Sequence, residues 1–492
     1  MLKKVLIAVG GVAVVGVVLY QVVGLRVRTD GSGMWPRYLS TGPDYDALEA
    51  DRARQRGQVP PPEPEPPQSE PRTAPVGSAT APPAAAALSE EAPAVMAEAP
   101  VAARTAREAW TDFRGPGRDG RYTRHPIRTD WPSDGLPKLW KQPIGPGYAS
   151  FVAADGRIFT IEQRRHQEVV AAYDLESGRE MWTNAWDGAF VEAMGGDGPR
   201  ATPTYHEGRL YALGALGELR CLDARTGAVM WRRNILSDAG ASNLQWGMAG
   251  APLIVGDTVI VLPGGPAGKS VAAYNRRSGE IVWTALDDQA SYASAMMVEL
   301  GGVRQLLVVT ATRVVGLPLE GGPVLWEQPW ETFNGINVSQ PLLLGGDRVL
   351  LSAAYGHGAM VLAVRRSGDR FSTETIWQNT RLKNKFTSSV LHEGYLYGLD
   401  EAILACVDAA TGELKWKAGR YGYGQVLLAG DRLVVLTEDG EVVQVKATPS
   451  GHQEVARFKA IDGKTWNHPI IVEGRLLVRN VQEMAAFDIR AR

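Results

Sequence analysis

The sequence predicts an all-β fold, an eight-bladed β-propeller of four-stranded antiparallel blades, from two repeats that run along the chain together. The first recurs about every 45 residues between Trp140 and Phe458. Each copy reads as a short apolar strand, a glycine turn and a second strand that ends in a large ring. The second repeat places a two-residue turn between successive rings. A period in the forties with paired strands is typical of a propeller blade and not of stacked helix pairs.

The ring-ended repeat is clearest in four stretches of the same form. They read AYDLESGREMW, CLDARTGAVMW, AYNRRSGEIVW and CVDAATGELKW, and degraded copies end at Trp326, Trp377 and Phe458. A tryptophan ring at this position fits flat between neighbouring blades, while the Asp and Thr or Ser side chains hydrogen-bond the turn. The predicted docking tryptophans are Trp140, Trp182, Trp231, Trp283, Trp326, Trp377 and Trp416.

The blade count comes from the second repeat, in which glycine supplies the positive φ that a tight hairpin requires. Its eight turns are Asp155-Gly156, Glu207-Gly208, Gly256-Asp257, Gly301-Gly302, Gly346-Asp347, Glu393-Gly394, Gly430-Asp431 and Glu473-Gly474. The glycine turns before an aromatic residue number only seven, at Gly178, Gly227, Gly279, Gly322, Gly368, Gly412 and Gly451. The last blade therefore lacks its fourth strand. We expect the unassigned strand KLWKQPI around Trp140 to complete it, because closure removes the exposed sheet edges.

The N-terminus is predicted to anchor the chain in a membrane. Residues 1–25 contain an uncharged run of 21 residues from Val5, long enough as a helix to span a hydrocarbon core of about 30 Å. No small-residue cleavage site follows the run, so an uncleaved single-pass anchor is favoured over a signal peptide. With a short tail ahead of the run, we expect a cytoplasmic N-terminus and a propeller in the periplasm or outside the cell, held by the inner membrane.

Residues 26–109 are predicted to be a disordered linker, a stalk between membrane and propeller, because Pro, Ala and Glu with few aromatics bury too little surface to fold. A short helix is expected within it at Pro43–Arg56, without changing the role of the stalk. The propeller domain then occupies 110–492. Its lead-in WTDFRGPGRDGRY, Trp110–Tyr122, is expected to pack as a strap or plug against one face, with a ligand site as the alternative.

Charge and cysteine usage exclude some function classes. The net charge is −2, without an Arg-rich stripe, so no nucleic-acid partner is expected. The two cysteines, Cys221 and Cys406, occupy the same position in distant repeats. They are therefore predicted to be buried and unbridged.

Candidate binding residues lie where the innermost strands of the blades begin, since propeller sites form at the central channel and loops on a rigid scaffold carry function. These segments are rich in Asn, Ser, Gly and aromatic residues. The candidates at the channel mouth are Trp246, Asn337, Lys383, Lys385, Tyr423, Trp466, Asn467 and His468. Together they fit an aromatic or anionic ligand, or a peptide edge. The alternative is that they only solvate the channel.

The sequence offers no catalytic or metal motif. The seven histidines show neither HxH nor HExxH spacing, so no zinc site is predicted. GGPAGKS at 264–270 misses the spacing of a phosphate loop, and the strands that follow it cannot provide the required helix N-terminus.

The turn sequence Ala/Cys-x-Asp-x-x-Thr/Ser-Gly-x-x-x-Trp, at 172–182, 221–231 and 406–416, resembles the docking repeat of quinoprotein-like (PQQ-repeat) propellers. The resemblance covers about 138–490. That family includes pyrroloquinoline-quinone (PQQ) dehydrogenases and the non-catalytic, BamB-like outer-membrane assembly propellers. The dehydrogenases carry adjacent cysteines under the quinone, acidic and amide calcium ligands and an aspartate base.

Departures from the dehydrogenase pattern decide the prediction. Cys221 and Cys406 are solitary, and 110–492 leaves no room for the long insertions of the enzymes. The size resembles the assembly propeller, which however is lipid-anchored at a cysteine that this chain lacks. We therefore expect a membrane-tethered, non-catalytic and monomeric propeller that binds protein partners or a ligand, with no cofactor. The alternative is a PQQ-dependent oxidoreductase, which would hold PQQ with calcium.

Overall fold

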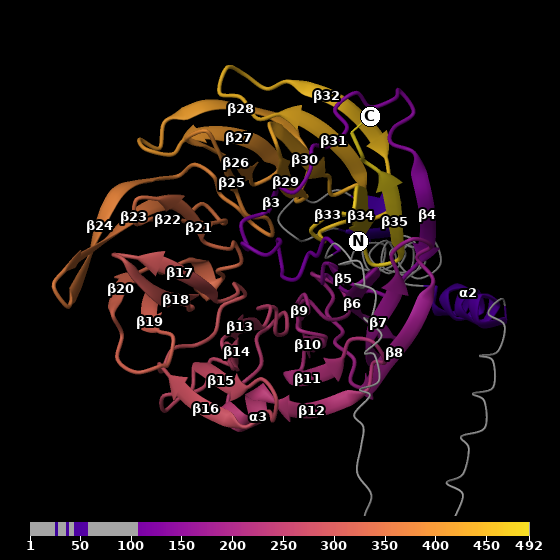
Figure 1. Cartoon of the computed structure of the whole chain (residues 1–492). Coiled ribbons are helices and arrows are strands. Elements are labelled where there is room, and N and C mark those ends of the chain that lie inside the picture. Colours follow the sequence, from indigo (N-terminus) through magenta and orange to yellow (C-terminus); the bar gives the residue numbers. More distant parts are fainter. Residues whose placement is uncertain (1–24, 28–35, 39–43, 58–106, 492) are drawn as a thin grey trace, which may run out of the picture.

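The computed structural model describes residues 25–27, 36–38, 44–57 and 107–491. Over these ranges the strands form eight blades around a central axis, with the first strand of each blade innermost (Figure 1). The predicted eight-bladed propeller of four-stranded antiparallel blades is confirmed. We number the blades 1 to 8 along the chain.

The first four blades use consecutive strands. Blade 1 consists of β5 (Val152–Ala154), β6 (Arg157–Arg164), β7 (Gln167–Asp174) and β8 (Glu180–Asp187). Blade 2 consists of β9 (Thr204–His206), β10 (Arg209–Leu213), β11 (Glu218–Asp223) and β12 (Val229–Asn234), followed by the short helix α3 (Ile235–Ala239). Blade 3 consists of β13 (Leu253–Val255), β14 (Thr258–Val261), β15 (Val271–Asn275) and β16 (Ile281–Ala285). Blade 4 consists of β17 (Met296–Leu300), β18 (Val303–Val309), β19 (Arg313–Pro318) and β20 (Trp326–Pro329), followed by the 3₁₀ turn η1 (Phe333–Gly335).

The last four blades include the two exceptions to this order. Blade 5 consists of β21 (Leu342–Gly345), β22 (Arg348–Ala353), β23 (Gly358–Ser367) and β24 (Arg370–Asn379). Blade 6 consists of β25 (Val390–His392), β26 (Tyr395–Asp400), β27 (Ile403–Asp408) and β28 (Leu414–Arg420). Blade 7 consists of β29 (Gln425–Ala429), β30 (Arg432–Leu436), β31 (Glu441–Lys446) and β32 (Glu454–Lys459), with β3 (Arg121–Tyr122) added in parallel to β29. Blade 8 consists of β33 (Ile470–Val472), β34 (Arg475–Arg479), β35 (Glu483–Asp488) and β4 (Lys138–Pro143).

The two ends of the propeller meet in blade 8, as the sequence predicts. Strand β4, from the start of the domain, pairs antiparallel with β35 at its end, with Trp140 opposite Ala486. Figure 1 shows the violet β4 beside the yellow β35. The eight predicted inner hairpins also form, each joining the first two strands of its blade. With β4 as its fourth strand, blade 8 is as complete as the other seven blades.

Five docking tryptophans join their blade to the next through a hydrogen bond as well as through packing. The indole Nε1 of Trp231, in blade 2, donates to the carbonyl of Arg276 in blade 3 at 3.0 Å. The same bond to the turn of the following blade is made by Trp140, Trp182, Trp377 and Trp416. Because the indole N–H of a buried tryptophan requires an acceptor, this bond fixes where the ring lies along the neighbouring turn.

A glycine lies beneath each of several docking rings. Gly227 has φ +76°, and a Cβ placed on it would lie 2.4 Å from Cε3 of Trp182. Gly178, Gly279 and Gly412 meet Trp140, Trp231 and Trp377 in the same way. The turn glycine thus serves two purposes, a left-handed backbone and a flat seat for the neighbouring ring.

Two docking positions differ from the prediction. The glycine under Trp283 is Gly321, not the predicted Gly322, because the turn of blade 4 is placed one residue earlier. Trp326 donates to the side chain of Gln305 in its own blade, at 2.6 Å. Strands β23 and β24 are ten residues long, so their turn projects beyond the ring of Trp326, and Gly368 has no atom near its Cβ position.

Cys221 and Cys406 are free and buried, as predicted. They lie opposite the rings of Trp231 and Trp416 in matching registers. The short strands β1 (Leu25–Val27) and β2 (Pro36–Tyr38) pair with each other. In the described part of the chain, no helix has both the length and the apolar character needed to cross a membrane. The anchor predicted for 1–25 lies outside the described residues, except for Leu25 in β1.

The helix expected inside the linker is present as α2 (Tyr45–Gly57). It differs from the expectation in its position, because it packs on the outside of the propeller next to β4 and β8 (Figure 1). Arg52 is the anchor: it donates to the carbonyl of Pro143 in β4 at 2.7 Å and approaches Glu180 of β8 at 3.3 Å. Within the range 26–109, predicted as a disordered stalk, this helix thus packs against the propeller, while 58–106 lie outside the described residues.

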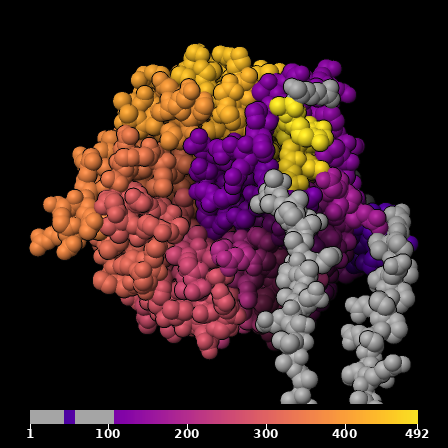
Figure 2. Space-filling view, in the orientation of Figure 1, coloured from indigo at the N-terminus to yellow at the C-terminus, as the bar shows by residue number. Residues whose placement is uncertain are grey.

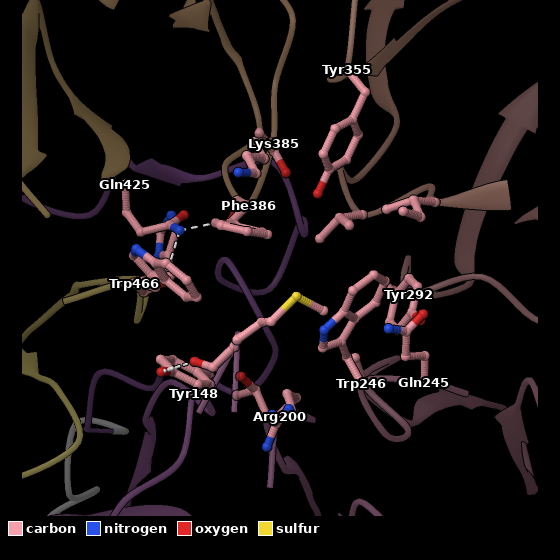
Figure 3. A pocket seen from close by; sticks show the side chains of 18 of the residues that line it. Tyr148, Arg200, Gln245, Trp246, Tyr292, Tyr355, Lys385, Phe386, Gln425 and Trp466 are labelled. Atoms are coloured by element: carbon pink, nitrogen blue, oxygen red, sulfur yellow. Dashed lines mark hydrogen bonds between the residues drawn. The ribbon is translucent and has the colours of Figure 1, made fainter. Parts of the chain in front are cut away.

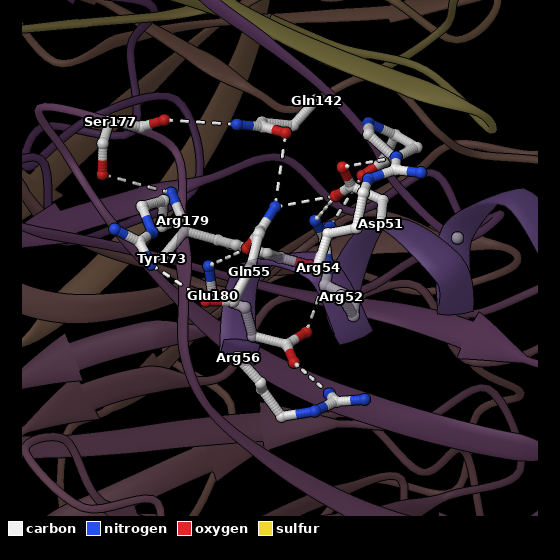
Figure 4. Close-up of polar contacts among 12 residues, drawn as sticks. Asp51, Arg52, Arg54, Gln55, Arg56, Gln142, Tyr173, Ser177, Arg179 and Glu180 are labelled. Carbon is white, nitrogen blue, oxygen red and sulfur yellow. Dashed lines mark hydrogen bonds and ion pairs between the residues drawn. The ribbon is translucent and has the colours of Figure 1, made fainter. Parts of the chain in front are cut away.

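Arg52 of α2 joins a network of buried charges that is centred on Glu162. Burial alone would raise the pKa of Glu162, but the charges of Arg164, Arg52 and Arg479 lower it. Gln55 adds three bonds, accepting from the backbone N–H of Glu180 and donating to Asp51 and to Gln142 of β4 (Figure 4). Since β4 belongs to blade 8 and β8 to blade 1, the helix bridges the boundary between the last blade and the first, which we call the seam.

Replacing Gly227 and Gly208 by alanine separates the two purposes of the turn glycine. Both have φ near +75°, but only Gly227 carries a ring, since nothing lies within 4 Å of the Cβ position of Gly208. We expect Gly208→Ala to cost about 1–2 kcal/mol of unfolding free energy for the left-handed backbone. Gly227→Ala should cost about 1–3 kcal/mol more, from overpacking against Trp182. Equal losses in urea unfolding would contradict the packing role.

Replacing Arg52 by alanine tests the seam contact, with Arg54→Ala as its control. The Arg52 side chain is 3% exposed and that of Arg54 is 68% exposed, on the same helix. We expect Arg52→Ala to lower the unfolding free energy by about 1.5–3 kcal/mol, the range for a hydrogen bond to a charged group. Arg54→Ala should change it by less than about 0.5 kcal/mol. Indistinguishable urea midpoints would show that α2 does not hold the seam.

Candidate functional site: a cavity in the central channel

Segments that lead into the innermost strands enclose a cavity of about 470 Å³ in the central channel (Figure 3). This volume lies within the range of about 300–1,000 Å³ that is usual for ligand sites. Aromatic side chains dominate its wall. They are Phe113, Tyr148, Trp246, Tyr292, Phe333, Tyr355, Phe386 and Trp466.

The floor of the cavity is the lead-in segment Trp110–Tyr122, which crosses the channel as the predicted strap. Figure 2 shows this violet segment filling the middle of the ring on one face. Trp110 bridges to Ala153 of β5, and Tyr205 of β9 donates its N–H to the carbonyl of Thr111. Phe113 points into the cavity, where its ring meets the edge of His468 at 6.1 Å. The structural role predicted for this segment is confirmed.

Two buried arginines of the strap hold it in place. Arg114 donates to the carbonyls of Ser388 and Ser389, at 3.1 and 2.8 Å, just before β25 of blade 6. Arg118 donates to the carbonyl of Ala295, at 2.9 Å, just before β17 of blade 4, and also to that of Pro252 before β13. Burial lowers the pKa of Arg114 to about 10, which leaves it charged at neutral pH. The RGPGR motif thus ties the inner ends of blades 6, 4 and 3 together across the channel.

Cations of the chain itself lie over several rings of the cavity wall. The ammonium of Lys385 lies 4.2 Å from the ring centre of Tyr423 and 5.0 Å from that of Phe386. The ammonium of Lys464 lies 4.1 Å from the ring centre of Trp466. A cation held over the face of a ring at such distances is attracted by the negative charge of the π system.

The third such cation, Arg200, stands over Phe190 at 4.4 Å and over Tyr148 at 5.5 Å. Its guanidinium donates to the carbonyls of Gly196 and Gly198. The charged residues that line the cavity are Arg200 and Lys385, and no Asp or Glu of the described residues lines it. The lining is therefore aromatic and positively charged.

The imidazole of His468 lines the cavity in a neutral state. Burial, and secondarily the charge of Arg114, lowers its pKa to about 3. Behind the wall, Glu438 accepts from the indole Nε1 of Trp466 at 2.9 Å and so orients that ring. These groups fix the shape of the wall without placing an ionised acid in it.

Apolar side chains are exposed around the mouth of the cavity. Phe333 is 59% exposed, and Met194 and Tyr355, which also line the cavity, are each more than one third exposed. The rings of Phe333 and Tyr355 contact each other with centres 5.6 Å apart. We call these three residues the apolar rim. Clustered exposed apolar groups mark binding surfaces more often than isolated ones do.

Four of the eight predicted candidates line the cavity: Trp246, Lys385, Trp466 and His468. The other four lie behind the wall. The amides of Asn337 and Asn467 donate to backbone carbonyls, which include those of Thr310 and Gly147.

The remaining two candidates behind the wall make other contacts. Lys383 forms an ion pair with Asp400 at 2.7 Å. The ring of Tyr423 lies 4.2 Å from the ammonium of Lys385. The cavity wall also contains Tyr148, Arg200, Tyr292 and Phe386, which are not among the predicted candidates although they too lie just before innermost strands. Phe333 and Tyr355 lie in loops that carry no repeat signal.

The cavity does not match the requirements of PQQ with calcium. Calcium prefers several carboxylate and carbonyl oxygens, and no carboxylate of the described residues lines the wall. In the part of the chain that the structure describes, no group of three His, Cys, Asp or Glu side chains is placed to hold a metal. Cys221 and Cys406 are buried in separate blades and form no pair beneath a ligand.

Comparisons with known proteins relate this architecture to others. A sequence profile of the PQQ-repeat family described as outer membrane protein assembly factor BamB matches residues 165–418. The crystal structure of BamB from Moraxella catarrhalis is similar over 72% of this chain and 97% of its own, with 16% identity and a TM-score of 0.50. No curated protein sequence gives a significant match.

Quinoprotein enzymes share the fold as well. A quinohemoprotein alcohol dehydrogenase from Comamonas testosteroni is similar over 77% of this chain and 80% of its own, with 13% identity and a TM-score of 0.58. A europium-containing methanol dehydrogenase covers 75% of this chain and 89% of its own, with 13% identity and a TM-score of 0.55. At these identities the similarity shows the fold alone.

Proposed function

This chain belongs to the PQQ-repeat family described as outer membrane protein assembly factor BamB, and we propose that it is a non-catalytic scaffold that binds a protein partner at the mouth of its central cavity. The observation that carries the proposal is the apolar rim, which stands exposed above an aromatic cavity whose lining contains no acid. Aromatic pockets surrounded by apolar groups are the common form of the energetic centre of protein interfaces.

Catalysis by the lining residues would need a group that exchanges a proton near neutral pH or attacks a substrate. The histidine in the lining, His468, has its pKa lowered to about 3. Both described cysteines are buried outside the cavity. The lining therefore presents neither an imidazole that titrates near neutral pH nor a thiol nucleophile.

A PQQ-dependent oxidoreductase remains the second candidate, because quinoprotein dehydrogenases share the fold at TM-scores of 0.55 and 0.58. The donor set argues against it, since a dehydrogenase of this class needs calcium ligands and a carboxylate base. The two candidates differ in what the cavity takes up.

Two measurements on the full-length chain separate these candidates. Incubation with PQQ and calcium should leave the melting temperature unchanged and leave no quinone absorbance on the protein. The photocrosslinker p-benzoylphenylalanine at Phe333, introduced in the native host, should give an adduct with one protein identifiable by mass spectrometry. The same group at Val282, which is equally solvent-exposed on the outer strand β16, is the control. Uptake of PQQ, or equal adducts from both positions, would refute the scaffold proposal.

We also propose that residues 1–25 anchor the protein in the cytoplasmic membrane and that the propeller lies in the periplasm, because the uncharged run is long enough to span a bilayer. In a bacterial host, the chain should stay in the membrane pellet after alkaline carbonate extraction. Protease added to spheroplasts should degrade the propeller. Extraction into the supernatant, or protection from the protease, would contradict the respective part.

A further inference from the structure

The cavity has one open end. The strap covers the other, where Arg114 and Arg118 bind carbonyls at the start of blades 6, 4 and 3 and Phe113 lines the cavity (Figure 2). A chain that enters the cavity must therefore leave through the same mouth. This geometry admits the end of a chain or the tip of a loop, and excludes a strand threaded through the channel.

The charge of the lining selects against cations. Among the rings of the lining, Phe386 has Lys385 over it at 5.0 Å, Trp466 has Lys464 at 4.1 Å, and Tyr148 has Arg200 at 5.5 Å. A cationic ligand would find these ring faces shielded and would meet charges of its own sign. An anion is attracted instead, because the charged side chains in the lining are Arg200 and Lys385.

Trp466 faces Trp246 and Tyr292 across the cavity, and Lys385 and Arg200 lie at opposite ends of the space between these rings (Figure 3). The rings of Trp246 and Tyr292 are inclined at 54° with centres 5.8 Å apart. Aromatic rings attract a further ring in offset or edge-to-face contact, and both rings of this pair line the cavity. A fitting occupant thus carries an aromatic group beside a negative charge.

The apolar rim points to a macromolecule as the source of that group. A small molecule deep in the cavity would leave the apolar rim open to solvent at the mouth, where Phe333 is 59% exposed and Met194 and Tyr355 are 42% and 41% exposed. A protein segment that inserts one aromatic side chain would cover the rim with its flanking residues. Burial of the rim would then add to the binding free energy.

We infer that the cavity binds a protruding acidic segment of a partner protein, a loop tip or chain end in which an aromatic side chain is flanked by Asp or Glu. The aromatic side chain packs between Trp246, Tyr292 and Trp466. The flanking carboxylates lie toward Arg200 and Lys385. This inference rests on the proposed scaffold function and specifies the chemistry of its partner.

Fluorescence anisotropy with the full-length chain tests this inference. The probe is fluorescein-labelled Gly-Asp-Phe-Glu-Gly amide, compared with Gly-Asn-Phe-Gln-Gly amide and with Gly-Asp-Ala-Glu-Gly amide. We expect the acidic aromatic peptide to bind at least tenfold more tightly than either comparison peptide. Its affinity should fall severalfold between 50 and 500 mM salt, since charge attraction is screened.

Matched variants place the binding in the cavity. Trp246→Ala should weaken binding of the acidic aromatic peptide at least tenfold. Met230→Ala, which changes an exposed apolar residue on the outer strand β12, should not alter it. Melting temperatures of both variants show whether each is folded. If Trp246→Ala unfolds the chain, Phe333→Ser on the rim replaces it, with the same expected loss.

Several results would overturn the inference. Equal binding of the acidic and neutral peptides would remove the charge argument, and equal binding of the alanine peptide would remove the aromatic one. Tighter binding of free phenylacetate than of the peptide would assign the cavity to a small molecule. If no peptide binds while crosslinks from Phe333 still form, the scaffold proposal stands and this partner chemistry is wrong.

Discussion

The structure depends on one repeated contact, an indole ring of one blade that lies on the left-handed glycine turn of the next. The ring buries a large apolar area, the missing Cβ of the glycine allows it to lie flat, and the indole N–H bonds a carbonyl of the same turn. In the pair Trp182 and Gly227, a Cβ would stand 2.4 Å from the ring. Because each contact sets the angle between two blades, its repetition sets how many blades close the circle and how wide the channel is.

Much of this could be predicted from the sequence, because the contact is written into each repeat. The glycine and tryptophan of the contact, such as Gly227 and Trp231, recur with fixed spacing. Because there are eight inner turns and only seven outer glycine turns, the sequence also predicts that β4 completes the last blade, as it does. Trp326 could not be predicted in detail. Its different bond follows from the length of β23 and β24 in the next blade, which no feature of its own repeat reveals.

The site at which α2 packs on the propeller could not be predicted from the sequence for a related reason. Its composition is polar, and Arg52 looks like any solvated arginine in DYDALEADRARQR. Its partners, Pro143 and Glu180, are about a hundred residues away and become neighbours only when the ring has closed. Long-range charge networks of this kind leave no periodic trace in the chain.

The cavity was predictable as a place but only partly as a set of residues. Asn337 and Asn467 stand in the right segments, yet their amides satisfy buried carbonyls, because unpaired backbone groups cost more than an amide withdrawn from the channel. The aromatic residues of the same segments are not needed to bond these carbonyls, and their rings form the cavity wall. The two asparagines that were predicted to bind a ligand thus hold the backbone around the channel, and the aromatic rings line the cavity.

The strap decides what kind of site this frame presents. Without it, an eight-bladed ring of this kind would enclose an open channel. With Arg114 and Arg118 bound to carbonyls of blades 6, 4 and 3, those blades are tied together and the channel ends at Phe113. Rigid walls lower the ordering cost of binding, and a closed floor forces any occupant to share the mouth with the apolar rim. Both effects favour recognition of a protruding segment, and neither helps a reaction that needs its substrate and product to exchange quickly.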